Sequence, residues 1–338
     1  MDRFTAKPPA PAADPPPTSP TAALAPLSAI PTASLTLLQE VGRGAFGSVH
    51  RGLYQGAPVA VKRIALRAVQ AQSLQKYLLT ELQALAAVAH PHLIRYLGAA
   101  QAPGEVLIVT EFMEGGALRG VLAGAAVAAA SQQQQQQQQA QLLPWRLRVA
   151  LARAAAEGLA ALHGAELLHR DIKTENLLLD DEWRLVISDF GFAKRIADLK
   201  GASPQPGTIL GSEGFMAPEV IFGEAYGEKA DVFSLGCVLA ELLTGLQPGV
   251  AGFLERTPRA KFAADLAQVR AAAPADAPQS FVECVCQCLA YEPEARLASD
   301  DALLWLRDLE AELPECSLGS LPRPWTCKEF RYTGEFVK

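Results

Sequence analysis

The chain has 338 residues, half of them hydrophobic, which is enough for one large domain or two lobes with flanking tails. Its formal net charge of −6 and its scattered Lys and Arg residues argue against a nucleic-acid partner, because such proteins usually present a basic face. No apolar run reaches the ~18–20 residues that span a bilayer, and the N-terminus lacks the apolar segment of a secretory signal. The sequence therefore predicts a cytoplasmic protein with no membrane span.

Three segments differ in composition from the rest of the chain. Residues 1–33 are rich in Pro and Ala and poor in bulky apolar groups, so we expect them to be disordered. Eight consecutive glutamines, Gln132–Gln139, predict a low-complexity insert over residues 131–140, most simply a solvated loop. Residues 311–338 contain three prolines and predict an irregular tail. Residues 34–310 remain as the folded domain.

The first part of that domain has the pattern of a β-sheet. From residue 35 to residue 110, short β-like runs predominate, namely LTLLQEV, SVHRGLY, PVAVKRI and VLIVTEF. Gln55-Gly56 predicts a turn between two of these runs. A single helical stretch, over residues 69–89, interrupts them.

The second part of the domain has a helical pattern. Pro144 suits the first position of a helix, and apolar residues then recur at intervals of three and four from Leu147 to Leu162. Residues 231–244 are apolar on nearly all sides and are followed by Gly245, which predicts a fully buried helix.

Three cysteines, Cys284, Cys286 and Cys288, alternate within one short segment and raise the question of a metal site. No histidine lies near them, and metal sites usually pair clusters of the CxxC type. We interpret them as small apolar residues of a helix.

Four short motifs follow one another in a fixed order, and together they are far more specific than any one of them. A glycine-rich segment, VGRGAFGSVH (Val41–His50), precedes VAVK at Val59–Lys62; HRDIKTEN and DFG follow at His169–Asn176 and Asp189–Gly191. These are the signatures of protein kinases. The chain resembles a eukaryotic protein kinase over about residues 35–309.

The glycine pattern alone is shared with dinucleotide-binding proteins, in which it leads into a helix. Here Ser48-Val49-His50 continues as a second β-like run, which argues against that alternative. The kinase resemblance implies an α+β, two-lobed fold. It would comprise a small antiparallel β-sheet lobe with one main helix, about residues 34–112, and a larger, mostly helical lobe, about residues 117–310.

The resemblance also implies a site for ATP between the lobes. Lys62 would hold the α- and β-phosphates and pair with Glu81, while backbone groups of Glu111 and Met113 would bind the adenine edge. Thr110 would guard the space behind the adenine. The full set of residues implied for ATP is Val41, Gly42, Gly44, Gly47, Val49, Ala60, Lys62, Thr110, Glu111 and Met113.

For catalysis the resemblance assigns separate tasks to four polar residues. Asp171 would orient the acceptor hydroxyl and accept its proton, and Lys173 would stabilise charge near the γ-phosphate. Asn176 and Asp189 would hold Mg²⁺, a hard cation that favours oxygen ligands. Protein hydroxyl groups would be the acceptors.

Two further features narrow the resemblance. Lys173, two residues after Asp171, is typical of serine/threonine kinases, and GSEGFMAPE at Gly211–Glu219 resembles their substrate-binding segment. Together with EGG after the interlobe strand and DVFSLG, it is most similar to the tyrosine-kinase-like group of serine/threonine kinases. A tyrosine or dual-specificity kinase and a pseudokinase-type scaffold remain alternatives. The family also implies a buried ion pair between Glu219 and Arg296, and a cap on the catalytic loop by Asp231.

Arg170 directly precedes Asp171, which in this family implies control by phosphorylation of the activation segment. Thr208 stands at the usual acceptor position and Ser203 is a second candidate. A phosphate on Thr208 would then contact Arg170 and Lys194. An upstream kinase or autophosphorylation would supply it.

Overall fold

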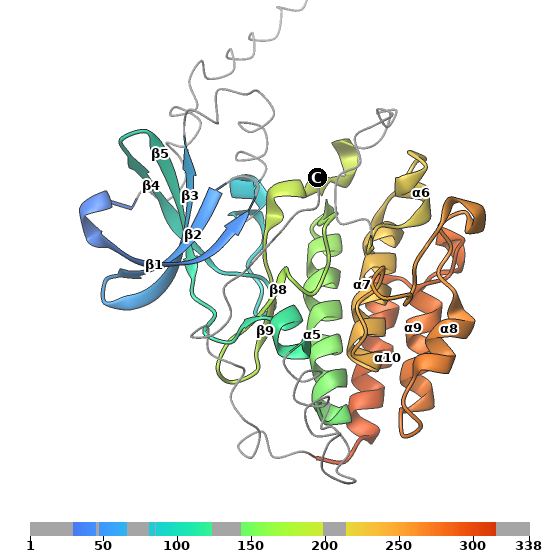
Figure 1. Cartoon of the computed structure of the whole chain (residues 1–338). Helices are drawn as coiled ribbons and strands as arrows, with labels where there is room; N and C mark the ends of the chain where they lie inside the picture. The colour runs from blue at the N-terminus through green and yellow to red at the C-terminus, as the bar shows by residue number, and fades with distance from the viewer. Residues whose placement is uncertain are drawn as a thin grey trace, which may run out of the picture.

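The computed structural model places a small sheet beside a larger group of helices (Figure 1). The predicted glutamine insert over residues 131–140 lies outside the described residues, and so do residues 1–29 and 316–338 of the two predicted tails. Of these tails the structure describes residues 30–33, where Ile30 is buried, and residues 311–315, of which 311 and 312 are helical. The structure describes residues 30–44, 47–65, 81–84, 86–123, 143–198 and 214–315.

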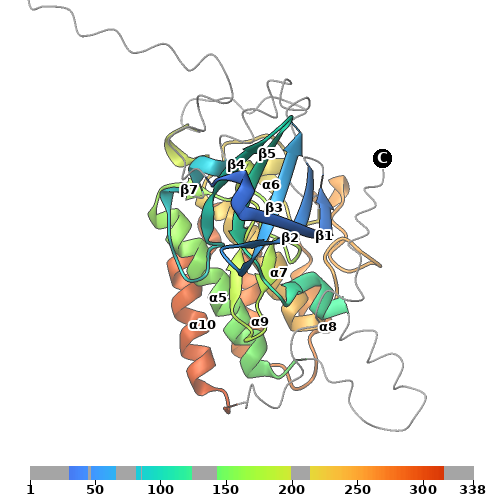
Figure 2. The same ribbon diagram turned by 90° about the vertical axis from the view of Figure 1, so that its left-hand side faces the viewer.

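The small lobe is built on one five-stranded antiparallel sheet with the strand order β1-β2-β3-β5-β4. Figure 2 shows this sheet facing the viewer. The predicted turn at Gln55-Gly56 joins β2 to β3, with positive φ at both residues. The strands are β1 (Leu35–Gly44), β2 (Gly47–Tyr54), β3 (Ala57–Ala65), β4 (Tyr96–Ala102) and β5 (Glu105–Glu111).

The predicted helix of the small lobe is described only in part. Residues 81–84 and 86–87 are helical, whereas residues 88–90 are not, so the helix ends before the predicted residue 89. Residues 69–80 of that prediction lie outside the described residues. The helical part packs its apolar side inward, and Leu82 is completely buried.

Short strands hold the loops that follow the sheet. β6 (Gly116–Ala117), β8 (Leu177–Leu179) and β9 (Leu185–Ile187) form a three-stranded sheet in the order β6-β8-β9. β7 (Leu167–Leu168) pairs with β10 (Lys194–Arg195). These pairings hold the chain next to both motifs, because HRD directly follows β7 and only Ser188 separates β9 from DFG.

The large lobe is mostly helical, and its helices pack side by side (Figure 1). Helix α5 begins one residue after Pro144, whose ψ of 145° is not helical, so Pro144 precedes the helix instead of forming its first position. The helices are α5 (Trp145–Gly164), α6 (Pro218–Ile221), α7 (Glu228–Thr244), α8 (Leu266–Ala272), α9 (Gln279–Cys288) and α10 (Ser299–Glu312).

Helix α7 lies inside the large lobe. Its residues from Ala230 to Leu243 are all buried, as the apolar pattern predicts, and it starts at Glu228, three residues before the predicted start. Gly245 ends it with a left-handed φ of 74° and donates its N–H to Glu241 O at 2.8 Å. A residue with a side chain would be strained there.

The three alternating cysteines lie in α9 and are buried, which confirms their interpretation as small residues of a helix. Burial raises the pKa of the Cys237 thiol, on neighbouring α7, to about 11. Among the described residues, no helix combines the length and apolarity needed to cross a bilayer.

A buried ion pair joins α6 to the segment before α10. Arg296 donates to both carboxylate oxygens of Glu219, at 2.6 and 2.8 Å, and the two residues are 3% and 5% exposed. The remaining donors of Arg296 reach the carbonyl oxygens of Ala290, Lys229 and Tyr291.

We expect Arg296→Met to lower the free energy of unfolding by about 3–5 kcal/mol, because it leaves Glu219 buried without its counter-ion. The exposed pair Arg270–Glu283 provides the control, and Arg270→Met should change stability by no more than about 1 kcal/mol. Urea unfolding of both variants measures the difference. Equal losses in the two variants would contradict the structural role of the buried pair.

Candidate active site

One face of the sheet carries the residues expected to contact a nucleotide. Directly opposed residues of antiparallel strands share a face. Val49 is opposite Lys62, and Ala60, two residues before Lys62, is opposite Thr110. Gly42 is opposite Val49, so its position belongs to the same face. Val41 and Gly44 lie in the same strand, β1.

Gly47 is required for a reason that the sequence did not reveal. A Cβ atom on Gly47 would lie 2.0 Å from the carbonyl oxygen of Arg63 in β3. The glycine therefore permits the close approach of two strands, in addition to any approach of a phosphate. The two residues between Gly44 and Gly47 are not described.

Lys62 links the small lobe to the DFG motif. Its Nζ lies 2.8 and 2.9 Å from the two carboxylate oxygens of Glu81 and 3.1 Å from Oδ1 of Asp189. Lys62 therefore connects the sheet both to the helical segment that carries Glu81 and to Asp189.

The pKa of Glu81 is raised by burial, and the nearby Asp189 adds to this effect, whereas Lys62 opposes it. Glu81 is 4% exposed. A buried carboxylate is stable only with a close cation. Lys62 therefore has a structural task at Glu81 even before any ligand binds.

The segment after β5 is braced by an arginine that the sequence reasoning missed. Arg184 donates to Glu111 Oε2 at 2.8 Å, to Asp180 Oδ2 at 2.9 Å and to the Met113 sulfur at 3.6 Å. The N–H of Glu111 donates to Arg95 O at 3.0 Å, so the protein itself uses this donor. The Thr110 hydroxyl donates to Glu111 O at 3.2 Å.

The HRDIKTEN segment forms a compact loop around Asp171. Lys173 Nζ lies 2.8 Å from Asp171 Oδ2, and Asn176 Nδ2 donates to the same oxygen at 2.9 Å and to the backbone oxygen of Asp171 at 2.8 Å. Asp171 is 5% exposed and Asn176 is 7% exposed. The three side chains therefore hold one another in a fixed arrangement.

Asp231, at the start of α7, binds the backbone of this loop. Its two carboxylate oxygens accept the N–H groups of His169 and Arg170, at 2.7 and 2.8 Å. His163 of α5 donates to it at 3.3 Å and also hydrogen-bonds Ser299 at 2.9 Å. The family-based expectation that Asp231 caps the loop is confirmed.

The catalytic loop and the DFG motif are joined directly. The N–H and the hydroxyl of Ser188 donate to Asn176 O at 2.8 and 2.9 Å. The rings of His169 and Phe190 pack edge to face, with centroids 5.2 Å apart. Asp189 has a left-handed φ of 61°, which is uncommon for a residue other than glycine. Asn176 and Asp189 are thereby held next to each other.

These two residues fit a magnesium ion. Both supply oxygen, and Mg²⁺ in nucleotide sites typically takes one or two protein oxygens together with phosphate oxygens and water. Among the described residues there is no cluster of three or more His, Cys, Asp or Glu that would bind a metal without a nucleotide. Asn176 and Asp189 would supply the protein oxygens of such a Mg²⁺ site, with phosphate oxygens and water as its other ligands.

A second brace of the catalytic loop also escaped the sequence reasoning. Glu241 of α7 is completely buried, and it accepts a hydrogen bond from the Thr174 hydroxyl at 2.9 Å and pairs with Arg119. The N–H of Arg119 donates to Thr174 O at 3.1 Å. Periodicity alone could not distinguish Glu241 from the apolar residues around it.

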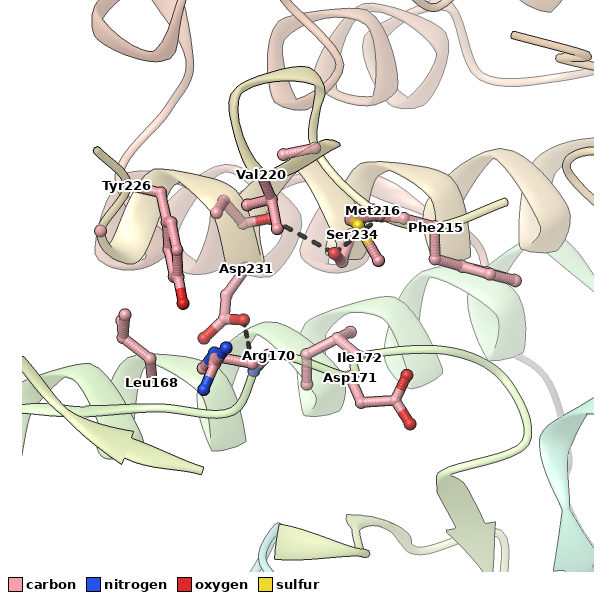
Figure 3. Close-up of a pocket in the computed structure, with 13 residues that line it drawn as sticks. Leu168, Arg170, Asp171, Ile172, Phe215, Met216, Val220, Tyr226, Asp231 and Ser234 are labelled. Atoms are coloured by element: carbon pink, nitrogen blue, oxygen red, sulfur yellow. Dashed lines mark hydrogen bonds between the residues drawn. The ribbon is translucent and has the colours of Figure 1, made fainter. Parts of the chain in front are cut away.

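The candidate phosphorylation sites Thr208 and Ser203 lie outside the described residues. Their expected partner Arg170 lines a pocket between α7 and the HRDIKTEN loop, and Figure 3 shows Tyr226 and Asp231 extending toward Arg170. The Arg170 guanidinium lies 5.5 Å from the centre of the Tyr226 ring. Lys194 of β10 is opposite Leu168 of β7. Leu168 stands two residues before Arg170 in the chain.

Comparison with known proteins agrees with this geometry. Residues 35–304 match the family model of the protein kinase domain. The chain is 34% identical over 278 residues to the "RasGEF domain-containing serine/threonine-protein kinase X" of Dictyostelium discoideum, covering 82% of this chain and 27% of that protein. It is 31% identical over 281 residues to "Probable serine/threonine-protein kinase kinX" of the same organism, covering 82% and 24%.

The chain belongs to the protein kinase family. The α+β, two-lobed fold that the sequence predicts is confirmed, with a five-stranded antiparallel sheet in the small lobe and mostly helices in the large one. The chain spans about a quarter of the length of these two relatives.

Asp231→Asn should lower the free energy of unfolding at pH 7 by about 1.5–3 kcal/mol, since charge-assisted hydrogen bonds are lost. Burial alone would raise the pKa of Asp231, but hydrogen bonds and the charges of His163 and His169 outweigh it and lower the pKa below 3.8. A carboxyl with a lowered pKa stabilises the fold above its unfolded pKa, and this stabilisation is lost as the pH falls through the folded pKa.

The difference between wild type and Asp231→Asn should therefore be constant above about pH 5 and shrink below it. Urea unfolding at several pH values measures it, and Asp308→Asn, whose side chain is 75% exposed, is the control. A difference that stays the same down to the acid limit would rule out the carboxylate as its source.

Proposed function

We propose that the chain is an ATP-dependent protein serine/threonine kinase that transfers the γ-phosphate of Mg-ATP to protein hydroxyl groups. The observation that carries the proposal is the cluster in which Asp171 is held by Lys173 and Asn176, at 2.8 and 2.9 Å. Phosphoryl transfer needs a positioned hydroxyl and charge stabilisation more than covalent chemistry.

Asp171 orients the acceptor hydroxyl and accepts its proton. Lys173, whose ammonium group lies at the same carboxylate, stabilises the charge that develops on the transferred phosphate. The 5% exposure of Asp171 keeps its carboxylate in a low-dielectric setting, where such interactions are strong.

Lys62 contacts the α- and β-phosphates and is oriented by Glu81. Asn176 and Asp189 would hold Mg²⁺, which would neutralise phosphate charge. Val41, Val49 and Ala60 would contact the adenine, Thr110 would bound its site, and the carbonyl of Glu111 and the backbone of Met113 would hydrogen-bond its edge. The N–H of Glu111 is already used by Arg95, which is why its carbonyl is assigned here.

Serine/threonine specificity is supported by Lys173 and by the printed names of the relatives. The motifs MAPE and DVFSLG, with EGG after β5, support the tyrosine-kinase-like group. A pseudokinase is disfavoured because the residues such proteins usually lose, among them Lys62, Asp171 and Asp189, are present and in contact with their partners.

Regulation by phosphorylation of Thr208 or Ser203 forms part of this proposal. It is supported by Arg170, which lines the pocket next to Asp171, and by Lys194 in the strand paired beside it. A phosphate carries about −1.5 to −2 charges and can order a loop opposite two cations.

The decisive experiment measures transfer of labelled phosphate from Mg-ATP to a basic acceptor protein. Asp189→Asn should reduce it by about 10²-fold or more, because a metal-binding carboxylate is lost, whereas Asp308→Asn should leave it unchanged. Label in hydrolysed product should occur on serine and threonine. Label on tyrosine would favour dual specificity, and ATP binding without any transfer by the wild type would favour a pseudokinase.

Replacing Thr208 by Ala should lower turnover severalfold, since no phosphate would then engage Arg170 and Lys194. Ser203→Ala, tested alongside, shows which hydroxyl is responsible. Steady-state rates and the phosphate content of the purified proteins provide the measurement. Turnover that is the same in both variants and in wild type would remove this form of regulation.

A further inference from the structure

The backbone of Gly214–Ala217, the described part of the expected substrate-binding segment, is held from two directions. Ser234 of α7 donates its hydroxyl to Phe215 O at 2.8 Å, from below. Gly214 packs so closely on the backbone of Pro248 that a Cβ atom would lie 2.8 Å from Pro248 O. Pro248 belongs to the connection between α7 and α8, and not to the catalytic machinery.

The same connection contributes an arginine. Arg256 donates through one terminal nitrogen to Met216 O at 2.5 Å and contacts Phe262 O at 3.4 Å. Met216 is 6% exposed. The carbonyl of Met216 is therefore fixed by a residue 40 positions further along the chain.

Arg256 is itself held in place. Its guanidinium lies 4.9 Å from the centre of the Phe233 ring in α7, and Arg296 contacts the same ring at 5.0 Å. Phe233 is completely buried. A planar guanidinium stacked on a fixed ring has little freedom, so its hydrogen bond to Met216 is made in one geometry.

Gly214–Ala217 lies beside the catalytic loop. Phe215, Met216 and Ala217 line the same pocket as Asp171 and Ile172 (Figure 3). Any shift of this segment therefore changes where an acceptor chain lies relative to Asp171. A displacement of about 1 Å can reduce a rate by about 10²-fold when reacting groups must align.

We propose that Arg256 is a positioning residue for the protein acceptor: it fixes the Met216 carbonyl and so sets the place of Gly214–Ala217 beside Asp171. The inference rests on the proposed kinase function. In this proposal the connection between α7 and α8, which carries Arg256, contributes to binding of the protein acceptor and does not contribute to binding of ATP.

The test compares Arg256→Met with Arg148→Met. Arg148 is a matched control, because its guanidinium also stacks on an aromatic ring, Trp145 at 4.3 Å, and also donates to backbone carbonyls, those of Leu143, Leu242 and Leu243. Of these, Leu242 and Leu243 lie at the C-terminal end of α7, whereas Phe233 lies nearer its start. Both variants lose a stacked guanidinium, but only Arg256→Met releases Met216.

In steady-state transfer to a serine peptide, Arg256→Met should raise KM for the peptide, or lower kcat/KM for it, by about tenfold or more, while KM for ATP changes less than about twofold. Arg256→Lys, which keeps one donor, should recover part of the loss. Arg148→Met should leave the peptide parameters near those of wild type. Equal losses in both Met variants, or a parallel rise in KM for ATP, would overturn the proposal.

A second readout does not depend on transfer. The N–H groups of Val220 and Ile221 both donate to Ala217 O at 3.1 Å, so their hydrogen exchange reports the position of that carbonyl. Exchange at both should be about tenfold faster in Arg256→Met than in Arg148→Met. If the wild type transfers no phosphate, the kinase proposal fails. Hydrogen exchange at Val220 and Ile221 that is unchanged in Arg256→Met would, independently, refute the role of Arg256.

Discussion

The buried carboxylate of Asp231 is the contact on which the candidate active site depends. It accepts two consecutive backbone N–H groups, those of His169 and Arg170. In an extended strand successive N–H groups point to opposite sides, so both can reach one carboxylate only if the chain turns between them. The positive φ of Arg170, 70°, provides this turn. The two hydrogen bonds offset the strain of this conformation. The same turn sets the position of the next residue, Asp171.

The same helix supports the site at further points. Along α7, Ser234 holds the Gly214–Ala217 segment and Glu241 holds Thr174 in the HRDIKTEN loop. Each is a polar group on a helix whose residues from Ala230 to Leu243 are all buried. An unpaired polar group there would cost free energy. Each of these polar side chains is therefore paired with a specific group of the site. In this way a mostly apolar helix positions a polar site.

The sequence predicted those parts of the fold and site that depend on short-range patterns. Four of the five strands of the small lobe, the buried helix and the DFG and HRD motifs could be located because their residues are close in the chain, whereas β4 (Tyr96–Ala102) was not predicted. The contacts of Arg184 with Glu111 and of Arg256 with Met216 were missed. They join residues 73 and 40 positions apart, and, unlike the Glu219–Arg296 pair, they were not implied by the family resemblance. No periodicity encodes such pairs. The conformation of Asp189 was also invisible, since a positive φ outside glycine depends on the packing around it.

If the site binds ATP as proposed, its charge gives a physical reason for Mg²⁺ to bind together with the nucleotide. Three carboxylates, those of Glu81, Asp171 and Asp189, face two ammonium groups, those of Lys62 and Lys173, which leaves a formal charge of −1. Nucleotide phosphates alone would meet a negative field at close range, where electrostatic interactions are strong. A divalent cation reverses the sign of the site to +1. In the proposed complex a divalent cation at Asp189 would offset the charge of that carboxylate, and Lys62, which lies between Glu81 and Asp189, would then be able to contact the phosphates.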